Sequence, residues 1–356
     1  MVTDEVRKYE SYVIYGAQVI AVGAREAIAH LTGIQPTSFV VGKPAGKTWF
    51  PTGNPEEIDG VPVMGIDTVP VDTFIVLGIT ELIQQEVIPY LDEHGYKNYY
   101  ALTQHEEHLL MSEYYDSMGM FPTIVGKMGI DFGLDFALYE VKNDRDKPLE
   151  HHPALFPYER EIQAGAAMAG TRIAEITDDT GLNISEKNRM YCEMSAVYWV
   201  WKNTNHDWIG IEHYRRHLLV TPEMLTDDID AILPLPYICY PHEMAQFLRF
   251  VPESVLEALL RALKKLHPDR YDAYHSILYG AYQYTYNLVC ARKPVFDEYC
   301  KWFFEITEYM ETMADEFPEL KETRALSYVA EVLTNLYFMY HQDDLRIKHV
   351  EKAIYV

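Results

Sequence analysis

Short apolar runs alternate with longer amphipathic stretches through residues 12–102, and this alternation most restricts the folds open to the chain. Apolar runs of strand length occupy residues 12–15, 38–42, 73–79 and 97–102, and stretches with helical spacing follow the first and third runs. Strands that alternate with helices form a parallel sheet on which the helices pack. The first part of the chain is therefore predicted to be an α/β domain with a parallel sheet.

A glycine turn follows the first predicted strand. Gly16 opens this turn and Gly23 lies further along, but Gln18 stands where a dinucleotide fingerprint needs its second glycine. That glycine lets the backbone approach a pyrophosphate, so nucleotide binding at Gly16 and Gln18 is weakly indicated and an NAD-dependent oxidoreductase is disfavoured. In the alternative interpretation, the turn joins a strand to a helix and the domain serves packing or assembly.

Residues 10–103, which include Gly60-Val-Pro-Val-Met64, resemble the small N-terminal domain of bacterial sugar O-acyltransferases. The resemblance implies a Rossmann-like, nucleotide-binding-like domain in which a similar glycine turn meets a nucleotide or sugar nucleotide. We assign this domain to residues 1–120, because strand periodicity is lost over residues 103–130.

Length and charge restrict the classes of function. A chain of 356 residues suggests about two domains, and a formal charge of −24 argues against nucleic acid as a partner. No apolar run reaches the roughly 18 residues of a membrane span, and no secretion leader is evident, so we expect a cytoplasmic protein with at most peripheral membrane contact. Four cysteines without metal-ligand spacing are predicted to be reduced core residues: Cys192, Cys239, Cys290 and Cys300.

Polar chemistry is densest between residues 177 and 219. Residues 178–188 have loop composition, residues 189–203 carry apolar side chains at helical spacing, and residues 208–211 form a short apolar run that predicts a strand. The polar residues 212–216 lie where that strand would end. Ligands of open α/β sheets bind beyond the carboxyl ends of strands, so a ligand site is expected there.

A second, larger domain is predicted for residues 121–356. Strands are expected at residues 136–141, 231–235 and 286–291, and helices at residues 253–266, 294–313 and 324–340. The C-terminal part is therefore helical. Glu331 stands among apolar neighbours in the last helix, where an unpaired carboxylate is costly.

Several polar strings resemble, in order, a bacterial family of capsular and exopolysaccharide glycosyltransferases that are galactofuranosyltransferase-like and of GT-A type. The strings are residues 178–188 (DDTGLNISEKN), 191–193 (YCE), 198–203 (YWVWKN), 209–216 (IGIEHYRR), 286–287 (YN) and 296–300 (FDEYC), together with Glu331. The resemblance covers residues 133–356. The resemblance implies that a sugar is transferred with inversion from a UDP-sugar to an acceptor glycan in capsule, exopolysaccharide or O-antigen synthesis. It also implies that the sugar is galactofuranose. The acceptor could be lipid-linked.

Inverting transfer needs one group that removes a proton from the acceptor hydroxyl. Four residues are candidates, and the sequence does not rank them: Glu331, His213, Glu193 and Asp179. Carboxylates and amides can form hydrogen bonds with the ribose, uracil and sugar of the donor, and cations can pair with its diphosphate. Residues predicted to bind it are Asp178, Asn183, Ser185, Lys187, Asn188, Tyr191, Glu212, Tyr214, Arg215, Arg216 and Asn287.

The leaving diphosphate also needs a cation. Many GT-A enzymes hold Mg²⁺ or Mn²⁺ with an Asp-x-Asp, and Glu212-His213-Tyr214 occupies that position here. One carboxylate and one histidine make a poor site for a hard cation. We therefore predict a metal-independent site in which Arg215 and Arg216 supply the charge, with Mg²⁺ or Mn²⁺ as the alternative.

Other interpretations stay open for this domain. Loop residues such as Asp178 could bond their own backbone, His213 could be a core histidine, and Glu331 could form a buried ion pair with an arginine. The whole protein could be a non-catalytic sensor or assembly protein that binds a nucleotide sugar without turnover.

Overall fold

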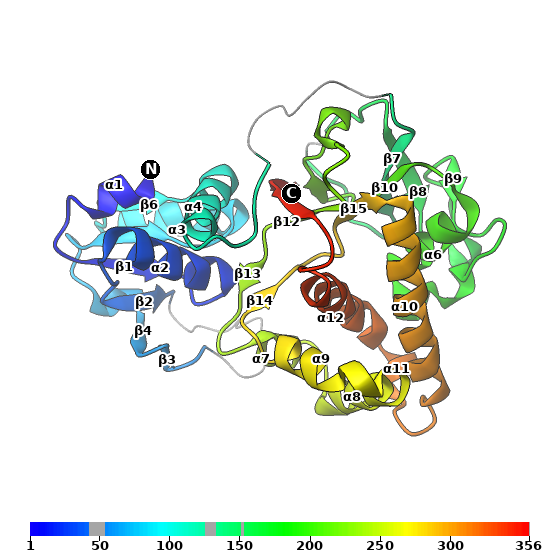
Figure 1. Ribbon diagram of the computed structural model, residues 1–356. Coiled ribbons are helices and arrows are strands. Elements are labelled where there is room, and N and C mark those ends of the chain that lie inside the picture. Colours follow the sequence, from blue (N-terminus) through cyan, green and yellow to red (C-terminus); the bar gives the residue numbers. More distant parts are fainter. Residues whose placement is uncertain (43–53, 125–132, 151–152, 356) are drawn as a thin grey trace. The chain divides into compact units, whose positions relative to one another are not determined.

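The computed structural model describes residues 1–42, 54–124, 133–150 and 153–355 of the chain (Figure 1). The chain packs as two compact units. The first comprises Met1–Pro122, Leu235–Arg249 and Ala281–Gln283, and the second comprises Thr123–Pro234, Phe250–Gly280 and Tyr284–Val356. Two short segments from the later part of the chain thus belong to the first unit.

The first unit contains a six-stranded sheet in the order β3-β4-β2-β1-β5-β6. Its strands are β1 (Tyr12–Tyr15), β2 (Ser38–Val41), β3 (Glu57–Ile58), β4 (Val61–Gly65), β5 (Phe74–Leu77) and β6 (Tyr99–Ala101). All neighbours pair in parallel except β3 and β4. The predicted α/β domain with a mostly parallel sheet is confirmed.

The α-helices that accompany this sheet in the described part of Met1–Pro122 are α1 (Val2–Val6), α2 (Val19–Thr32), α3 (Glu81–Glu93) and α4 (Gln104–Ser117). Helix α4 begins with a capping box, in which Thr103 and Glu106 each accept a hydrogen bond from the other's backbone N–H. Gly23 lies in α2, and a Cβ there would lie 3.3 Å from the Met111 sulfur of α4. The small residue therefore permits close packing of α2 and α4.

The returning segments add a two-stranded ladder to the first unit. Strand β13 (Tyr237–Ile238) pairs antiparallel with β14 (Tyr282–Gln283), and the short helix α7 (Glu243–Phe247) follows β13. The hydroxyl of Tyr115 in α4 donates a hydrogen bond to the Pro236 carbonyl at 3.0 Å. This bond ties the returning chain to the first unit.

The second unit contains a nine-stranded mixed sheet with the main order β16-β12-β15-β10-β7-β8-β9, and β11 joins β10 to β17 at one end. Its strands are β7 (Phe136–Lys142), β8 (Glu159–Gln163), β9 (Ile176–Thr177), β10 (Trp208–His213), β11 (Arg216–Leu218), β12 (Ala231–Pro234), β15 (Val289–Arg292), β16 (Ile347–Val350) and β17 (Lys352–Ile354). Strand β10 pairs in parallel with β7 and antiparallel with β15, so it lies inside the sheet.

Helices of the second unit cover this sheet and one another. They are α5 (Asn188–Tyr191), α6 (Met194–Asn203), α8 (Glu253–Leu266), α9 (Tyr271–Leu278), α10 (Lys293–Thr312), α11 (Glu319–Glu322) and α12 (Ala325–Tyr340). Helix α10 packs against β10, β15 and α12. Nearly every residue of α12 is buried, so this helix is a central part of the core. The predicted C-terminal helices are confirmed.

Two expected elements differ from the structure. The helix expected over residues 189–203 is broken at Cys192, whose φ of 49° ends α5 before α6 begins. The strand expected from residue 286 begins only at Val289, because Tyr286 and Asn287 have φ of 69° and 53°, outside the strand region. Both departures lie beside the candidate site.

None of the helices in the described part of the chain combines the length and the apolar character that a bilayer crossing requires.

Candidate active site

A tight turn places two arginines at the carboxyl end of β10. His213, the last residue of β10, pairs with Arg216, the first residue of the antiparallel strand β11, so Tyr214 and Arg215 form the turn. The guanidinium of Arg216 lies 4.2 Å from the centre of the Tyr286 ring, and that of Arg215 lies 5.3 Å from the Tyr214 ring. Within the described residues, the buried Nε of Arg215 has no hydrogen-bond partner and neither arginine forms an ion pair. Within the described residues, no ion pair therefore neutralises either guanidinium.

Asn287 connects this turn to a carboxylate on another segment. Its Nδ2 donates a hydrogen bond to Oε1 of Glu193 at 2.9 Å, and its Oδ1 accepts one from the Thr334 hydroxyl of α12 at 2.9 Å. Asparagine tolerates the left-handed backbone that this position requires better than most residues. The amide thus fixes Glu193 relative to α12.

Glu331 lies on α12 close to the same group of residues. It is partly exposed, whereas its neighbours Ala330 and Val332 are buried. The pKa of Glu331 is raised to about 7, first by burial and then by the negative charge of Glu193, while Arg216 and the backbone N–H of Tyr286 act in the opposite direction. The carboxyl group therefore titrates near neutral pH.

His213 is held as a neutral imidazole. Burial and the adjacent positive charges of Arg216 and Arg215 lower its pKa to about 3. Its Nδ1 accepts a hydrogen bond from the backbone N–H of Arg215 at 3.4 Å. Near neutral pH the ring can accept hydrogen bonds, but it is a weak base.

Two further ionisable residues that the sequence did not single out belong to this group. Arg324, directly before α12, donates from its Nε to the Cys192 sulfur at 3.1 Å and interacts electrostatically with Glu193. Burial raises the pKa of Asp146, which follows β7 and interacts with Arg215 and Glu193. A polar loop after a strand was a signal for Asp146, whereas the tertiary contacts of Arg324 left no sequence signal.

Asp178 has an internal role in its loop. Its carboxylate is fully buried and accepts hydrogen bonds from the backbone N–H groups of Gly165 and Ala166 at 2.9 Å, and from the hydroxyls of Ser185 at 2.5 Å and Ser195 at 2.6 Å. These four bonds use both oxygens. Asp178 and Ser185 therefore fix the conformation of the loop. This agrees with the alternative interpretation that loop residues bond their own backbone.

The two asparagines of this loop also bond nearby chain. Asn183 donates to the Gly181 carbonyl at 3.1 Å and accepts from the Ser185 N–H at 3.2 Å. Asn188 donates to the Cys192 carbonyl at 2.6 Å, which supports the break between α5 and α6. The structure gives both asparagines a role in loop geometry.

Three predicted residues lie in separate pairings. Asp179 forms an ion pair with Arg172 at 2.5 Å; burial acts to raise the pKa of Asp179, but hydrogen bonds from Thr177 and Arg172 outweigh it and lower the pKa. Lys187 and Tyr191 both bond Glu311 of α10, with contacts of 2.8 and 2.6 Å. None of these three contacts involves the arginines of the turn.

Glu212 faces away from the arginine turn. Adjacent residues of a strand point to opposite faces, so Glu212 and His213 cannot hold one ion together. Glu212 is 1% exposed, and its Oε2 accepts the backbone N–H of Leu218 at 3.1 Å. Residues 212–214 therefore do not fit a cation that bridges a diphosphate at the arginine turn.

The predicted N-terminal residues lie in the first unit. Gly16 has φ of 116°, and a Cβ there would lie 2.8 Å from the Gly78 carbonyl oxygen, so the turn requires glycine. The side chain of Gln18 accepts a hydrogen bond from Arg249. Gln18 also lines a small cavity together with Val22 and Tyr240.

The structure thus brings predicted residues of several segments together at the turn that contains Tyr214, and six of them are called the arginine-turn site: Glu193, His213, Arg215, Arg216, Asn287 and Glu331. All six belong to the second unit. The site combines two cations without ion-pair partners among the described residues, a carboxyl group that titrates near pH 7, and a neutral imidazole. Such a set can bind an anion and accept a proton.

Comparison with solved structures finds a glycosyltransferase fold. A structure described as the apo form of the bifunctional glycosyltransferase WbbM matches 62% of this chain with a TM-score of 0.52 and 24% sequence identity. This chain spans less than half of that protein's length, because the match covers 45% of it. This match confirms the predicted glycosyltransferase-like α/β fold, and it concerns the fold alone.

Sequence comparison identifies the family. No curated protein matches the chain. A family model described as "Domain of unknown function (DUF4422)" matches residues 149–343, which is more than half of the chain and includes every residue of the arginine-turn site. The chain belongs to the DUF4422 family.

Proposed function

We propose that the chain is a glycosyltransferase that moves a sugar from a UDP-sugar to an acceptor glycan with inversion at the anomeric carbon. The arginine-turn site carries this proposal, because two arginines that have no ion-pair partner among the described residues lie near a carboxyl group of near-neutral pKa. The glycosyltransferase-like fold supports it.

Arg215 and Arg216 would neutralise the leaving diphosphate. As the bond between the anomeric carbon and the diphosphate oxygen breaks, negative charge grows on the phosphates. A cation about 4 Å from that charge contributes about 4 kcal/mol at a partly buried site. Guanidinium groups also match phosphate oxygens in pairs. The poor fit of residues 212–214 to a bridging cation favours metal-independent transfer.

Glu331 would be the catalytic base. It takes the proton of the acceptor hydroxyl while that oxygen attacks the anomeric carbon and UDP leaves. A base works best when its pKa lies near the working pH, and the pKa of Glu331 is about 7. His213 and Asp179 are weaker bases, because their pKa values are lowered. This ranks candidates that the sequence left equal.

Glu193 would act through its neighbours. Its negative charge helps to raise the pKa of Glu331, and Asn287 holds its carboxylate in place at 2.9 Å. The half-buried Tyr286 ring beside Arg216 offers a surface on which a uracil or a sugar can stack. The loop around Asp178 would position the site rather than contact the donor.

The donor we propose is UDP-galactofuranose, and the acceptor is a glycan of capsule, exopolysaccharide or O-antigen synthesis, which can be lipid-linked. The sequence strings that resemble galactofuranosyltransferases, including residues 178–188 and 209–216, support this choice. The same resemblance supports a GT-A type arrangement for the second unit.

The test is UDP release from a panel of UDP-hexoses, with UDP-galactofuranose and UDP-galactopyranose as matched isomers and glycan fragments as acceptors. We expect acceptor-dependent UDP release with the furanose donor, and loss of it in Arg216→Ala. The control is Arg261→Ala, an arginine that is already paired with Glu257 and Glu316. Absence of release with every donor would overturn the transferase proposal. Tight UDP binding without transfer would favour the sensor interpretation.

A further inference from the structure

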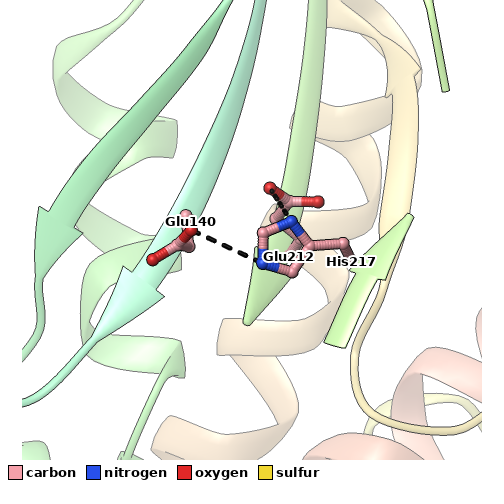
Figure 2. Close-up of side chains that lie close together, drawn as sticks. All are labelled: Glu140, Glu212 and His217. Atoms are coloured by element: carbon pink, nitrogen blue, oxygen red, sulfur yellow. Dashed lines mark ion pairs between the residues drawn. The ribbon is translucent and has the colours of Figure 1, made fainter. Parts of the chain in front are cut away.

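A row of ionisable side chains crosses four neighbouring strands of the second sheet. Glu140 of β7 pairs in register with Glu161 of β8 and with Glu212 of β10. On the far side, Nδ1 of His217 in β11 lies 3.4 Å from Oε1 of Glu212, and its Nε2 lies 3.5 Å from Oε2 of Glu140 (Figure 2). The row therefore places three carboxylates side by side on one face.

The three residues at the centre of this row are buried from solvent. Glu140, Glu212 and His217 are 0%, 1% and 4% exposed. Like charges directly opposite one another destabilise a sheet, and burial of each charge adds a large desolvation cost. Lys142 lies 2.5 Å from Glu161 but 3.8 Å from Glu140, so its ammonium group serves mainly the outer glutamate. A positive charge beside Glu212 would offset the cost of burying its carboxylate.

One carboxylate oxygen of Glu212 lies in the cluster with Glu140 and His217 and has no hydrogen-bond partner among the described residues. Within the described part of the chain, the buried Oε1 of Glu212 accepts no hydrogen bond, while its Oε2 bonds the Leu218 N–H. Buried polar atoms without a partner are rare in folded proteins, and an ion is one common explanation. This oxygen faces His217 and lies in the cluster with Glu140.

We propose that Glu140, Glu212 and His217 bind one divalent transition-metal ion of the Zn²⁺ or Mn²⁺ class. One ligand atom from each residue lies within 4.8 Å of the other two. Ligand atoms at about 2.1 Å from one ion lie at most about 4.2 Å apart, so a small contraction of side chains completes the site. An imidazole with two carboxylates favours these ions over Mg²⁺ or Ca²⁺, which prefer oxygen ligands throughout.

The ion would stabilise the arrangement of the strands and would not contact the diphosphate. Neighbouring strand residues point to opposite faces, so Glu212 and His217 point away from His213 and Arg216. Three strands contribute one ligand each, which fixes the turn between β10 and β11 that carries the arginines. This site is independent of the proposed transfer reaction, because its ligands are not residues of the arginine-turn site.

The experiment uses the full chain without a polyhistidine tag, stripped with EDTA and dialysed. Titration with ZnCl₂ or MnCl₂ is followed by calorimetry, by metal analysis after dialysis and by the melting temperature. We expect one ion per chain and a melting temperature that rises with metal concentration, since the ion binds the folded state. Glu140→Gln and His217→Gln should each lower the affinity at least tenfold. Glu161→Gln, the matched control in the same row, should retain the ion.

Two results would overturn the proposal: the absence of stoichiometric Zn²⁺ or Mn²⁺ in the unmodified chain, or equal retention of the ion by Glu140→Gln. If a variant fails to fold, X-ray absorption at the zinc edge of the unmodified chain decides. One imidazole with oxygen ligands supports the site, and sulfur ligands contradict it. Loss of metal binding with intact UDP release would leave the proposed transferase function standing.

Discussion

Replacing Glu331 by glutamine should lower activity and raise stability, and the size of the stability change follows from its pKa. That pKa is raised from 4.5 to about 7 in the folded chain. The folded state therefore binds the proton more tightly than the unfolded state, and this group's contribution to stability falls as pH rises from 4.5 to 7. At about 1.4 kcal/mol per pKa unit, and allowing for partial exposure, ionised Glu331 costs the fold about 2–3 kcal/mol above pH 7.

The expected result is therefore a difference that depends on pH. At pH 8, Glu331→Gln should melt about 4–12 °C above the unmodified chain, while near pH 4.5 the two should melt together. Transfer activity should drop by roughly 10²–10⁴-fold at pH 8, since the base is lost. Tryptophan fluorescence suits the measurement, because four of the five tryptophans (Trp199, Trp201, Trp208 and Trp302) lie in the second unit.

A control separates the effect of the partly buried Glu331 carboxyl from that of glutamates in general. Glu305 is exposed on α10, so Glu305→Gln should leave both the melting temperature and its pH dependence nearly unchanged. A destabilising Glu331 carboxylate is refuted if Glu331→Gln shows no stabilisation at pH 8, or the same stabilisation at pH 4.5 as at pH 8.

Arg216, Glu331 and Asp178 each have a separate measurable effect. Arg216→Ala should weaken UDP binding by about 10- to 100-fold in calorimetry, because charged hydrogen bonds contribute about 1.5–3 kcal/mol, and an unchanged affinity would exclude a role in diphosphate binding. The kcat/KM of the unmodified chain should rise about tenfold per pH unit below pH 7 and level off above it, as expected for a base with the pKa of Glu331; a flat profile would contradict this assignment. Asp178→Asn should lower the free energy of unfolding by about 2–4 kcal/mol in urea, since its amide opposes donors that now bond the carboxylate, and a loss below about 0.5 kcal/mol would exclude the scaffold role.

Much of the element order could be predicted from local sequence patterns. Apolar runs and helical spacing correctly indicate strands β1, β7 and β10 and helices α8, α10 and α12, because each buries a continuous apolar face. The break at Cys192 and the left-handed residues Tyr286 and Asn287 could not be predicted. Tertiary packing fixes these backbone angles, and the local sequence contains no glycine to mark them.

The other features that the sequence did not predict depend on contacts between segments that are far apart in the chain. The return of Leu235–Arg249 to the first unit rests on contacts such as the bond from Tyr115 to Pro236, which local patterns cannot indicate. The cluster of Glu140 and His217 was missed for the same reason, because these residues are far apart in the chain and meet through strand register.

Composition alone could not separate binding residues from scaffold residues in the loop of Asp178. Asp, Asn and Ser form the same hydrogen bonds with a ligand or with their own backbone. Arg215 and Arg216 could be proposed from the sequence, because two adjacent cations at a strand end are a simple local signal. Glu331 was indicated by its apolar neighbours, although its proximity to Glu193 and Arg216 came from the fold.

A crystal structure of the chain with UDP tests the central claim most directly. The proposed function predicts that the diphosphate contacts the guanidinium groups of Arg215 and Arg216, with Glu331 facing the side on which the sugar would lie. UDP bound elsewhere, for example in the cavity beside Gln18 of the first unit, or absent at millimolar concentration, would contradict it.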